Sequence, residues 1–436
     1  MRHVRVKLKQ SCRYSIALFK PPGAPSVRSR IFDAGSPRGC IPMSLTLASR
    51  RRADALETRP ALFCFSHLRW DFVWQRPQHL LTRAAQTYDV FFFEEPVLKP
   101  GVTPHLDISV AAPRVSVLVP VLPERRSHAD LMSLQKELIE DYLASLPRQR
   151  RVFWYYTPAA LAFTSDLSRD VTVYDNMDEL SAFRGASAEL VQYEIDLLGK
   201  AEIVFTGGRS LFEAKQARHR NIHCFPSSID VEHFAAARLK LQEDPADQAA
   251  IAHPRIGFFG VIDERMDIGL LRDVAGLRPD WQFVMIGPVV KIAPEVLPRA
   301  RNIHWLGMRC YKELAGYLAR WDLGFMPFAL NESTRFISPT KTPEFLAAGL
   351  PVVSTAVPDV VSTYGDAGLV QIAADAAGVI RAIERLLAGR TSGWLADVDA
   401  RLRQESWDST WASMNALSRE SAGMPRLDVR DSASAH

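Results

Sequence analysis

Short apolar runs alternate with longer amphipathic stretches along most of this chain. A run of about four to eight apolar residues is typical of a strand buried on both faces of a sheet, whereas apolar positions three or four residues apart predict a helix. Helices are predicted at 131–146 and 188–200 and from Arg209. The strands predicted in the amino-terminal part are 61–66, 88–93, 106–111, 116–119, 152–155, 171–174, 203–206 and 222–225. This alternation indicates a parallel sheet with helices on both faces.

The same alternation begins again after a polar break that runs from Ser227 to Pro245. The strands predicted in this second set are 255–259, 282–286, 303–306, 323–326, 352–353 and 368–371, and the helices are 268–277, 312–320 and 376–387. We therefore predict an α/β fold of two doubly wound, Rossmann-like domains that face a cleft. Ligands of such sheets bind outside the carboxyl ends of the strands.

The chain divides into five predicted segments. In order, these are a basic extension expected to be disordered, an amino-terminal sheet domain, a carboxyl-terminal sheet domain, a helix that packs back toward the amino-terminal domain and a disordered tail, at 1–59, 60–235, 236–405, 406–420 and 421–436. Trp407 and Trp411 are four residues apart, so both lie on one face of the returning helix.

Composition and charge narrow the class of protein. The 436 residues are 47% hydrophobic and 23% charged, as in an ordinary globular protein. Residues 1–59 hold a heavy excess of Arg and Lys, so the remainder is close to neutral or slightly acidic, which argues against a nucleic-acid-binding protein. No apolar run approaches the roughly 20 residues that span a bilayer. We expect a cytoplasmic protein whose basic extension could touch an acidic membrane surface, although a transit peptide or a start at Met43 is equally open.

The five cysteines are scattered and form no CxxC pair. This pattern indicates neither a disulfide framework nor a zinc site, and it fits a reducing compartment.

One stretch, 338–355, organises the candidate chemistry. It reads as a loop, a short helix and a buried strand, with Lys341 and Glu344 in the first helical turn and Ser338 and Thr340 just before it. A lysine, hydroxyls and backbone N–H groups at a helix start form a ready anion site, and the carboxylate suits the hydroxyls of a nucleotide or nucleotide sugar. The alternative is a capped helix with solvated charges.

A second candidate site follows the strand at 255–259. There the chain passes through Gly260 into a helix, and Arg265 is placed where its cation could reach the same anion as Lys341. The alternative is a surface arginine paired with Asp263 or Glu264.

The loop after the first strand is rich in aromatic and basic side chains. Aromatic faces can pack on a sugar ring, and arginines can make paired hydrogen bonds to it. The residues concerned are His67, Arg69, Trp70, Trp74 and Arg76. Alternatively, the loop packs on its own domain.

Two more features of the amino-terminal half follow strands. Asp175 and Asp178 could orient sugar hydroxyls or act in acid–base chemistry, or they could form a solvated turn. A metal is not favoured by this spacing. The stretch 206–210 predicts a turn that starts a helix, and its glycine pair would allow close approach to the cleft.

Together these segments, over about residues 61–420, resemble retaining glycosyltransferases of the GT-B type, group 1 or family four. The resemblance is strongest at 341–353, with a glutamate, a small-residue helical run and Gly-x-Pro-Val-Val. The opening stretch 65–77 resembles a subgroup that includes teichuronic-acid and exopolysaccharide transferases. The chain departs from the family at Phe336, where a second glutamate is usual, and at Val261, where an arginine is usual.

The resemblance implies a hexosyltransferase that moves a sugar from a nucleoside-diphosphate sugar to a glycan or lipid-linked acceptor with retention, in cell-envelope or exopolysaccharide biosynthesis. It needs no metal or other cofactor. The donor would be bound by Gly260, Arg265, Ser338, Thr340, Lys341 and Glu344. His67 and Asp178 would be catalytic. The acceptor would be bound by Arg69, Trp70, Trp74, Arg76 and Asp175. Two alternatives are a sugar-nucleotide epimerase of the same fold and a non-catalytic partner protein.

Overall fold

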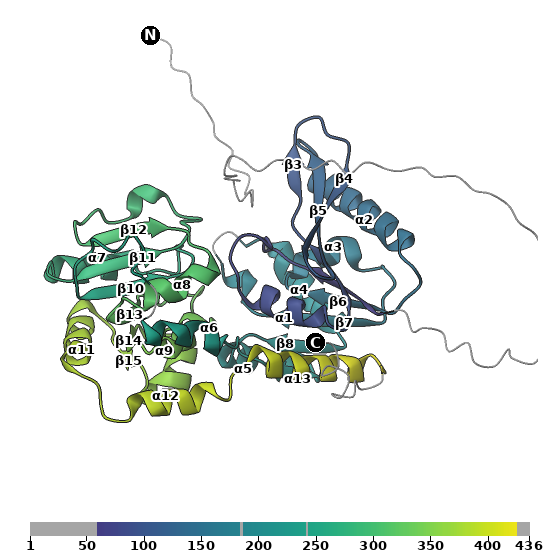
Figure 1. Cartoon of the computed structure of the whole chain (residues 1–436). Coiled ribbons are helices and arrows are strands. Elements are labelled where there is room, and N and C mark those ends of the chain that lie inside the picture. The colour runs from purple at the N-terminus through teal and green to yellow at the C-terminus, as the bar shows by residue number, and fades with distance from the viewer. Residues whose placement is uncertain (1–58, 184–185, 241–242, 425–436) are drawn as a thin grey trace, which may run out of the picture. The chain divides into compact units, whose positions relative to one another are not determined.

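The structure, a computed structural model, describes residues 59–183, 186–240 and 243–424 (Figure 1). The extension predicted at 1–59 therefore lies almost wholly outside the described residues, as does most of the predicted tail. The tail was predicted to begin at residue 421, but Met424 is buried in the core beside the carboxyl-terminal helix, so the predicted start is too early.

Within these ranges the first sheet has nine strands in the order β3-β5-β2-β1-β6-β7-β8-β9, with β4 paired to β5. The strands are β1 (Ala61–Phe65), β2 (Asp89–Phe93), β3 (Val97–Lys99), β4 (His105–Ala112), β5 (Val115–Pro123), β6 (Arg151–Tyr155), β7 (Val171–Asn176), β8 (Ile203–Thr206) and β9 (Ile222–Cys224). The pairs are parallel except β4·β5, which is antiparallel. The strand expected at 106–111 thus exists but runs against the predicted parallel direction.

Helices cover both faces of this sheet. They are α1 (Arg76–Ala84), α2 (His128–Ser145), α3 (Leu161–Thr164), α4 (Ala188–Lys200), α5 (Arg209–Lys215) and, returning from the chain end, α13 (Trp407–Ser421). Side chains of α1 and α13 share one core, and those of α2, α3 and α4 share the core on the opposite face. All five residues of β1 are buried, which explains its continuous apolar sequence.

The second sheet has six strands among the described residues, in the order β12-β11-β10-β13-β14-β15. They are β10 (Arg255–Phe259), β11 (Gln282–Ile286), β12 (Ile303–Gly307), β13 (Leu323–Met326), β14 (Val352–Ser354) and β15 (Gln371–Ile372). All of these pairs are parallel, so the two predicted Rossmann-like sheets are confirmed.

Helices on the faces of the second sheet position the candidate residues. They are α6 (Val231–Ala235), α7 (Ile268–Leu277), α8 (Tyr311–Leu318), α9 (Lys341–Ala347), α10 (Pro358–Val360), α11 (Ala376–Ala388) and α12 (Trp394–Leu402). A Cβ on Gly324 of β13 would lie 2.7 Å from the Phe345 ring. The glycine therefore lets α9 pack directly on the sheet.

The returning helix α13, yellow in Figure 1, lies beside α1, β7 and β8. Trp407 stacks on His79 with ring centroids 4.7 Å apart, and Trp411 lies in the same core. The Tyr88 hydroxyl donates to Asn415 Oδ1 at 2.8 Å. The end of the chain thus completes the core of the amino-terminal sheet.

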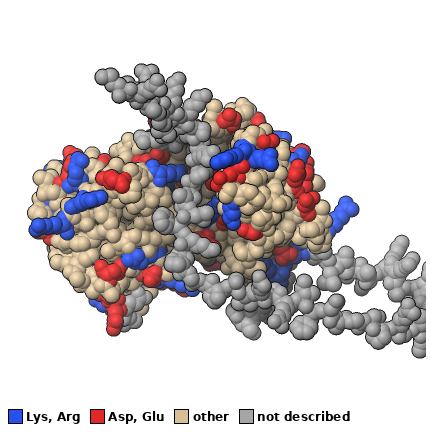
Figure 2. Space-filling view, turned by 90° about the horizontal axis from the view of Figure 1, so that it is seen from above, with Lys and Arg blue, Asp and Glu red and all other residues tan. Residues whose placement is uncertain are grey.

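None of the described helices is long and apolar enough to cross a membrane. On the face seen in Figure 2, the acidic and basic side chains of the described residues are intermingled.

Candidate active site

Lys341, the first residue of α9, lies against the turn that follows β10. A Cβ on Gly260 would lie 2.8 Å from Lys341 Cε, and the Gly260 φ of +141° is one that side chains disfavour. A Cβ on Gly287, after the neighbouring strand β11, would lie 1.8 Å from the Gly260 carbonyl oxygen. Two glycines therefore bring the ends of β10 and β11 together beside the lysine.

Arg265 follows the same turn and is held by Asp263. Its Nε donates to Asp263 Oδ1 at 3.0 Å, and its Nη2 donates to Asp263 Oδ2 at 2.8 Å. Burial opposes the charge of Arg265, but the hydrogen bonds and the charge of Asp263 prevail and raise its pKa. Arg265 is thus paired with Asp263, as the alternative expected, but it is partly buried rather than a surface arginine, and the pair fixes the direction of its guanidinium.

The charges of Arg265 and Lys341 act on each other. Burial lowers the pKa of Lys341 most, Glu344 opposes this shift, and the Arg265 charge lowers the pKa further. Lys341 Nζ donates to Thr340 Oγ1 at 3.2 Å. Two neighbouring cations repel each other in a partly buried site. An anion bound between them would relieve this repulsion.

Glu344 lies on the same turn of α9 and is 8% exposed. Burial raises the pKa of Glu344 to about 7, although Lys341 and Thr340 lower it in part. The side chain can therefore hold or release a proton near neutral pH.

The charge of Asp178, from the amino-terminal half, interacts with this group of charges. Burial raises the pKa of Asp178, and the charge of Arg265 is the largest effect that lowers it. Lys341 is also affected by the Asp178 charge. The carboxylate expected to be catalytic therefore lies near the cations expected to bind the donor.

His67 lies two residues past β1. Burial, and then the charge of Lys291, lower the pKa of His67 to about 4, although the Tyr156 backbone opposes the shift. Its Nδ1 is buried and has no hydrogen-bond partner among the described residues. The imidazole is therefore neutral at pH 7.

Sequence reasoning missed Lys291 and Glu95 as site residues. Lys291 lies beyond Gly287, and its charge acts on Asp178, His67 and Glu95 alike. Glu95 lies two residues past β2, as His67 lies two residues past the neighbouring strand β1. Burial raises the pKa of Glu95 to about 7, while Arg69 and then Lys291 lower it. The signal for Glu95 was its position at the end of a strand.

Arg76 and Asp175, predicted to bind the acceptor, form an ion pair inside the amino-terminal domain. Arg76 Nη2 lies 2.9 Å from Asp175 Oδ1, and the two side chains are 1% and 0% exposed. Arg76 Nη1 also donates to the Phe225 carbonyl at 2.7 Å. Their predicted contact with an acceptor does not fit this burial, because neither side chain reaches the surface.

The other three acceptor candidates differ in exposure. Trp70 is 5% exposed and packs edge-on against Phe92 in the core. Arg69 is paired with Glu94 at 2.8 Å, and Glu94 also accepts the Trp70 backbone N–H. Trp74 is 39% exposed and lies 6.4 Å from the Tyr311 ring. Of the five, Trp74 and the half-buried Arg69 can meet a ligand.

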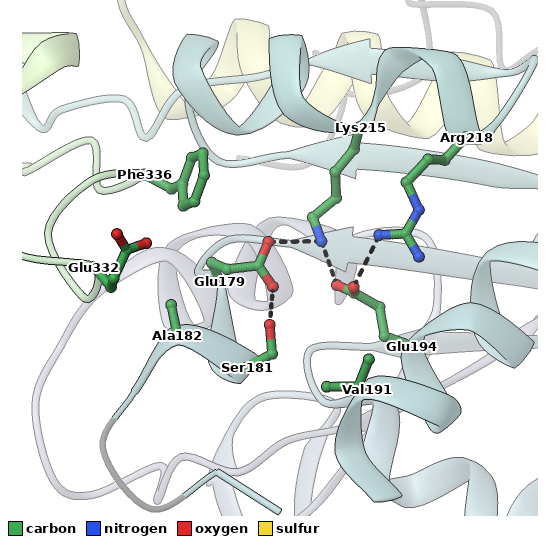
Figure 3. A pocket seen from close by; sticks show the side chains of 9 residues that line it. All are labelled: Glu179, Ser181, Ala182, Val191, Glu194, Lys215, Arg218, Glu332 and Phe336. Carbon is green, nitrogen blue, oxygen red and sulfur yellow. Dashed lines mark hydrogen bonds and ion pairs between the residues drawn. The ribbon is translucent and has the colours of Figure 1, made fainter. Parts of the chain in front are cut away.

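A pocket of about 510 Å³ lies beside Glu179, the residue after Asp178 (Figure 3). In Figure 3, Lys215 reaches between Glu179 and Glu194, at 2.7 and 2.6 Å. The other lining residues are Ser181, Ala182, Val191, Arg218, Glu332 and Phe336. The position where the resemblance leads one to expect a second glutamate is thus a phenylalanine on the pocket wall.

The described residues contain no group of three or more His, Cys, Asp or Glu side chains that could hold a metal ion. That the protein needs no metal stays a prediction.

Two comparisons show what this arrangement is similar to. Residues 253–389, which include all six strands of the second sheet, match the family described as "Glycosyl transferases group 1". The fold is that of GT-B glycosyltransferases: sucrose-phosphate synthase of Thermosynechococcus elongatus aligns with a TM-score of 0.64 and 16% identity over 83% of this chain and 98% of that one. HepE of Anabaena, solved in complex with UDP, aligns with a TM-score of 0.57 and 13% identity over 82% of this chain and 98% of that one.

A curated relative is TuaH of Bacillus subtilis (strain 168), which bears the name "Putative teichuronic acid biosynthesis glycosyltransferase TuaH". It is 27% identical over 235 residues, which are 49% of this chain. The matched part spans 58% of the relative's length.

Proposed function

We propose that this protein is a GT-B glycosyltransferase that moves a sugar from a nucleoside-diphosphate sugar to a glycan or lipid-linked acceptor, in the biosynthesis of a cell-envelope polysaccharide or exopolysaccharide. The observation that carries the proposal is that Lys341 lies against the Gly260 turn, with the charges of Arg265 and Asp178 acting on it. The names of TuaH and of the UDP-bound HepE support the same class of reaction and a nucleotide donor.

In this proposal Lys341 and Arg265 bind the diphosphate of the donor. Negative charge grows on the diphosphate as the bond to the sugar breaks, and fixed cations in a partly buried site stabilise that charge. The Asp263 pair keeps the guanidinium in place, so little reorganisation is needed during the reaction.

Ser338, Thr340 and Glu344 complete the donor site. We assign Glu344 to the ribose or donor hydroxyls, because a carboxylate accepts hydrogen bonds from two neighbouring hydroxyls. Burial makes the charged form costly, and hydroxyl donors would lower the pKa of Glu344 from its value of about 7.

His67 and Asp178 would face the transferred sugar, and Trp74 with Arg69 would meet the acceptor. The neutral imidazole of His67 can donate a hydrogen bond to a sugar hydroxyl through its N–H, or accept one through its other ring nitrogen. Retention of the anomeric configuration is the expectation that the family resemblance adds. The cytoplasmic location and the contact of residues 1–59 with a membrane surface remain proposals from composition.

Product analysis tests the function. The protein is incubated with UDP-, GDP- and ADP-sugars, with and without a cell-envelope glycan fraction, and the released nucleoside diphosphate and any new glycoside are measured. Transfer that needs the acceptor supports the proposal, whereas conversion of the donor into an isomeric nucleotide sugar would indicate an epimerase.

A non-catalytic GT-B protein is the second candidate, because Phe336 lines the pocket where the family resemblance leads one to expect a second glutamate. It predicts nucleotide binding without release of the diphosphate from any of these donors.

A further inference from the structure

Asp359 of α10 connects the two sheet domains through backbone hydrogen bonds. Its Oδ1 accepts the N–H of Ser210 at 2.9 Å, and its Oδ2 accepts the N–H of Arg209 at 3.0 Å. Both N–H groups open α5, which lies about 150 residues earlier in the chain. Helix starts leave such donors without partners in their own helix, and here a carboxylate of the other domain accepts from two of them.

This contact depends on the glycine before α5. A Cβ on Gly208 would lie 2.2 Å from Asp359 Oδ2 and 2.8 Å from the Cβ of Ser338. Gly208 has an extended backbone, with φ −170°, so the position needs glycine for space rather than for conformation. The turn therefore meets both Asp359 and the loop that holds Ser338.

Gly207, the other glycine of the pair, faces the opposite way. A Cβ there would lie 2.6 Å from the Met177 carbonyl oxygen, and the Gly207 N–H donates to the Asn176 carbonyl at 2.9 Å. Met177 directly precedes Asp178. One turn thus touches the chain next to Asp178 on one side and the chain next to the donor residues on the other.

We propose that Asp359 is a positioning residue: it holds the Gly207–Gly208 turn against Ser338 and thereby sets Asp178 opposite Lys341. Asp359 is 4% exposed and touches no proposed substrate position, so it acts through the turn. The effect of Asp359 on turnover rests on the proposed function. The link, meaning its two hydrogen bonds to the start of α5, does not.

The proposal predicts different effects on nucleotide binding and on sugar transfer, whereas a general loss of stability would weaken both. Lys341, Arg265 and Gly260 all belong to the second domain, so nucleotide binding should survive loss of the Asp359 hydrogen bonds, whereas an added side chain at Gly208 would also crowd Ser338 of the donor site. Transfer needs Asp178 in place, and a displacement of about 1 Å can cost about 100-fold in rate. Loss of the link should therefore lower kcat while leaving nucleotide affinity within about twofold.

Two variants disturb the link from opposite sides. Asp359→Asn leaves one carbonyl oxygen that can accept from only one of the two backbone N–H groups. The side-chain NH₂ then faces the other N–H group, and two donors cannot bond to each other. Gly208→Ala keeps the carboxylate but fills the space that it needs. The matched controls are Asp366→Asn, an exposed aspartate of the same segment, and Gly199→Ala, where an added Cβ meets nothing within 4 Å.

The experiment combines amide hydrogen exchange with kinetics on the full chain. We expect both variants to lose protection at the Arg209 and Ser210 amides and to lower kcat about 10-fold or more, and we expect Asp359→Asn to bind UDP, GDP or ADP as the wild type does. Protection that survives in Asp359→Asn would overturn the link, and a joint fall of kcat and nucleotide affinity in that variant, or an unchanged kcat, would overturn the positioning role. If the wild type turns over no donor, the proposed function is overturned. The expected effect of Asp359 on kcat then falls with it, whereas the hydrogen-bonded link between the domains is still tested by amide exchange.

Discussion

Lys341 occupies the space that a side chain at Gly260 would fill, since its Cε lies 2.8 Å from the position of a Cβ there. Gly260→Ala should therefore displace the lysine and also strain a backbone with φ +141°. We expect a loss of nucleoside-diphosphate affinity of about 10-fold or more, which corresponds to about 1.4 kcal/mol. Isothermal titration with UDP, GDP and ADP measures it. Gly276→Ala, where an added Cβ meets nothing within 4 Å, is the control and should bind as the wild type does.

The raised pKa of Glu344 predicts that the folded protein loses stability as pH rises. Its pKa is about 7 in the folded protein against an ordinary value of 4.5, so the folded state holds a proton that the unfolded state has released between these values. Stability from this group is therefore full below pH 4.5 and falls by up to about 3 kcal/mol as pH rises to 7.

Denaturant unfolding of wild type and Glu344→Gln at pH 5 and pH 8 checks this. The glutamine variant should lose less stability between the two pH values than the wild type. Equal losses would show that Glu344 ionises normally.

Lys291 should lower the pKa values of two groups at once, which disfavours the charged imidazole and favours the charged carboxylate. Its charge lowers the pKa of His67, which is about 4, and that of Glu95, which is about 7. Lys291→Ala should therefore raise both pKa values, as followed by NMR titration of the imidazole and carboxyl signals. Lys312→Ala, an exposed lysine on α8, is the control and should move neither. A His67 pKa that stays at about 4 in Lys291→Ala would contradict the assignment of Lys291 to this site.

The buried Arg76–Asp175 pair should stabilise the fold rather than bind sugar. Asp175→Asn leaves a buried guanidinium without its charge partner and should cost about 3–5 kcal/mol of unfolding free energy. Asp273→Asn, in an exposed pair with Arg272, should change stability by about 0.5 kcal/mol or less. A stable Asp175→Asn protein with weakened acceptor binding would restore the original prediction.

The sequence was most informative where strands are buried on both faces. The apolar run predicted at 255–259 coincides with β10, and that at 61–66 exceeds β1 by one residue. Strand β4 was found as a strand, but its direction was not, because periodicity along one strand does not specify the direction of its neighbour. Its exposed side chains, such as Val110 at 77%, mark an antiparallel edge rather than a central strand.

The placement of Gly260, Arg265 and Lys341 was also predictable, because each follows or opens an element at the same sheet edge. The acceptor side was not. Charged residues are usually exposed, so Arg76 was interpreted as a surface group, although its partner lies 99 residues away in the sequence. Lys291 was missed because a loop lysine has no local signal until the fold places it beside His67.

The central claim is that Lys341 and Arg265 together bind a diphosphate. Isothermal titration of Lys341→Ala, Arg265→Ala and the double variant with a nucleoside diphosphate and with the matching nucleoside tests it most directly, with Arg272→Ala as control. We predict that each single change weakens diphosphate binding by about 10-fold or more while nucleoside binding is unchanged, and that the two effects are not additive because the cations share one anion. Diphosphate affinity that is unchanged in both single variants would contradict the account.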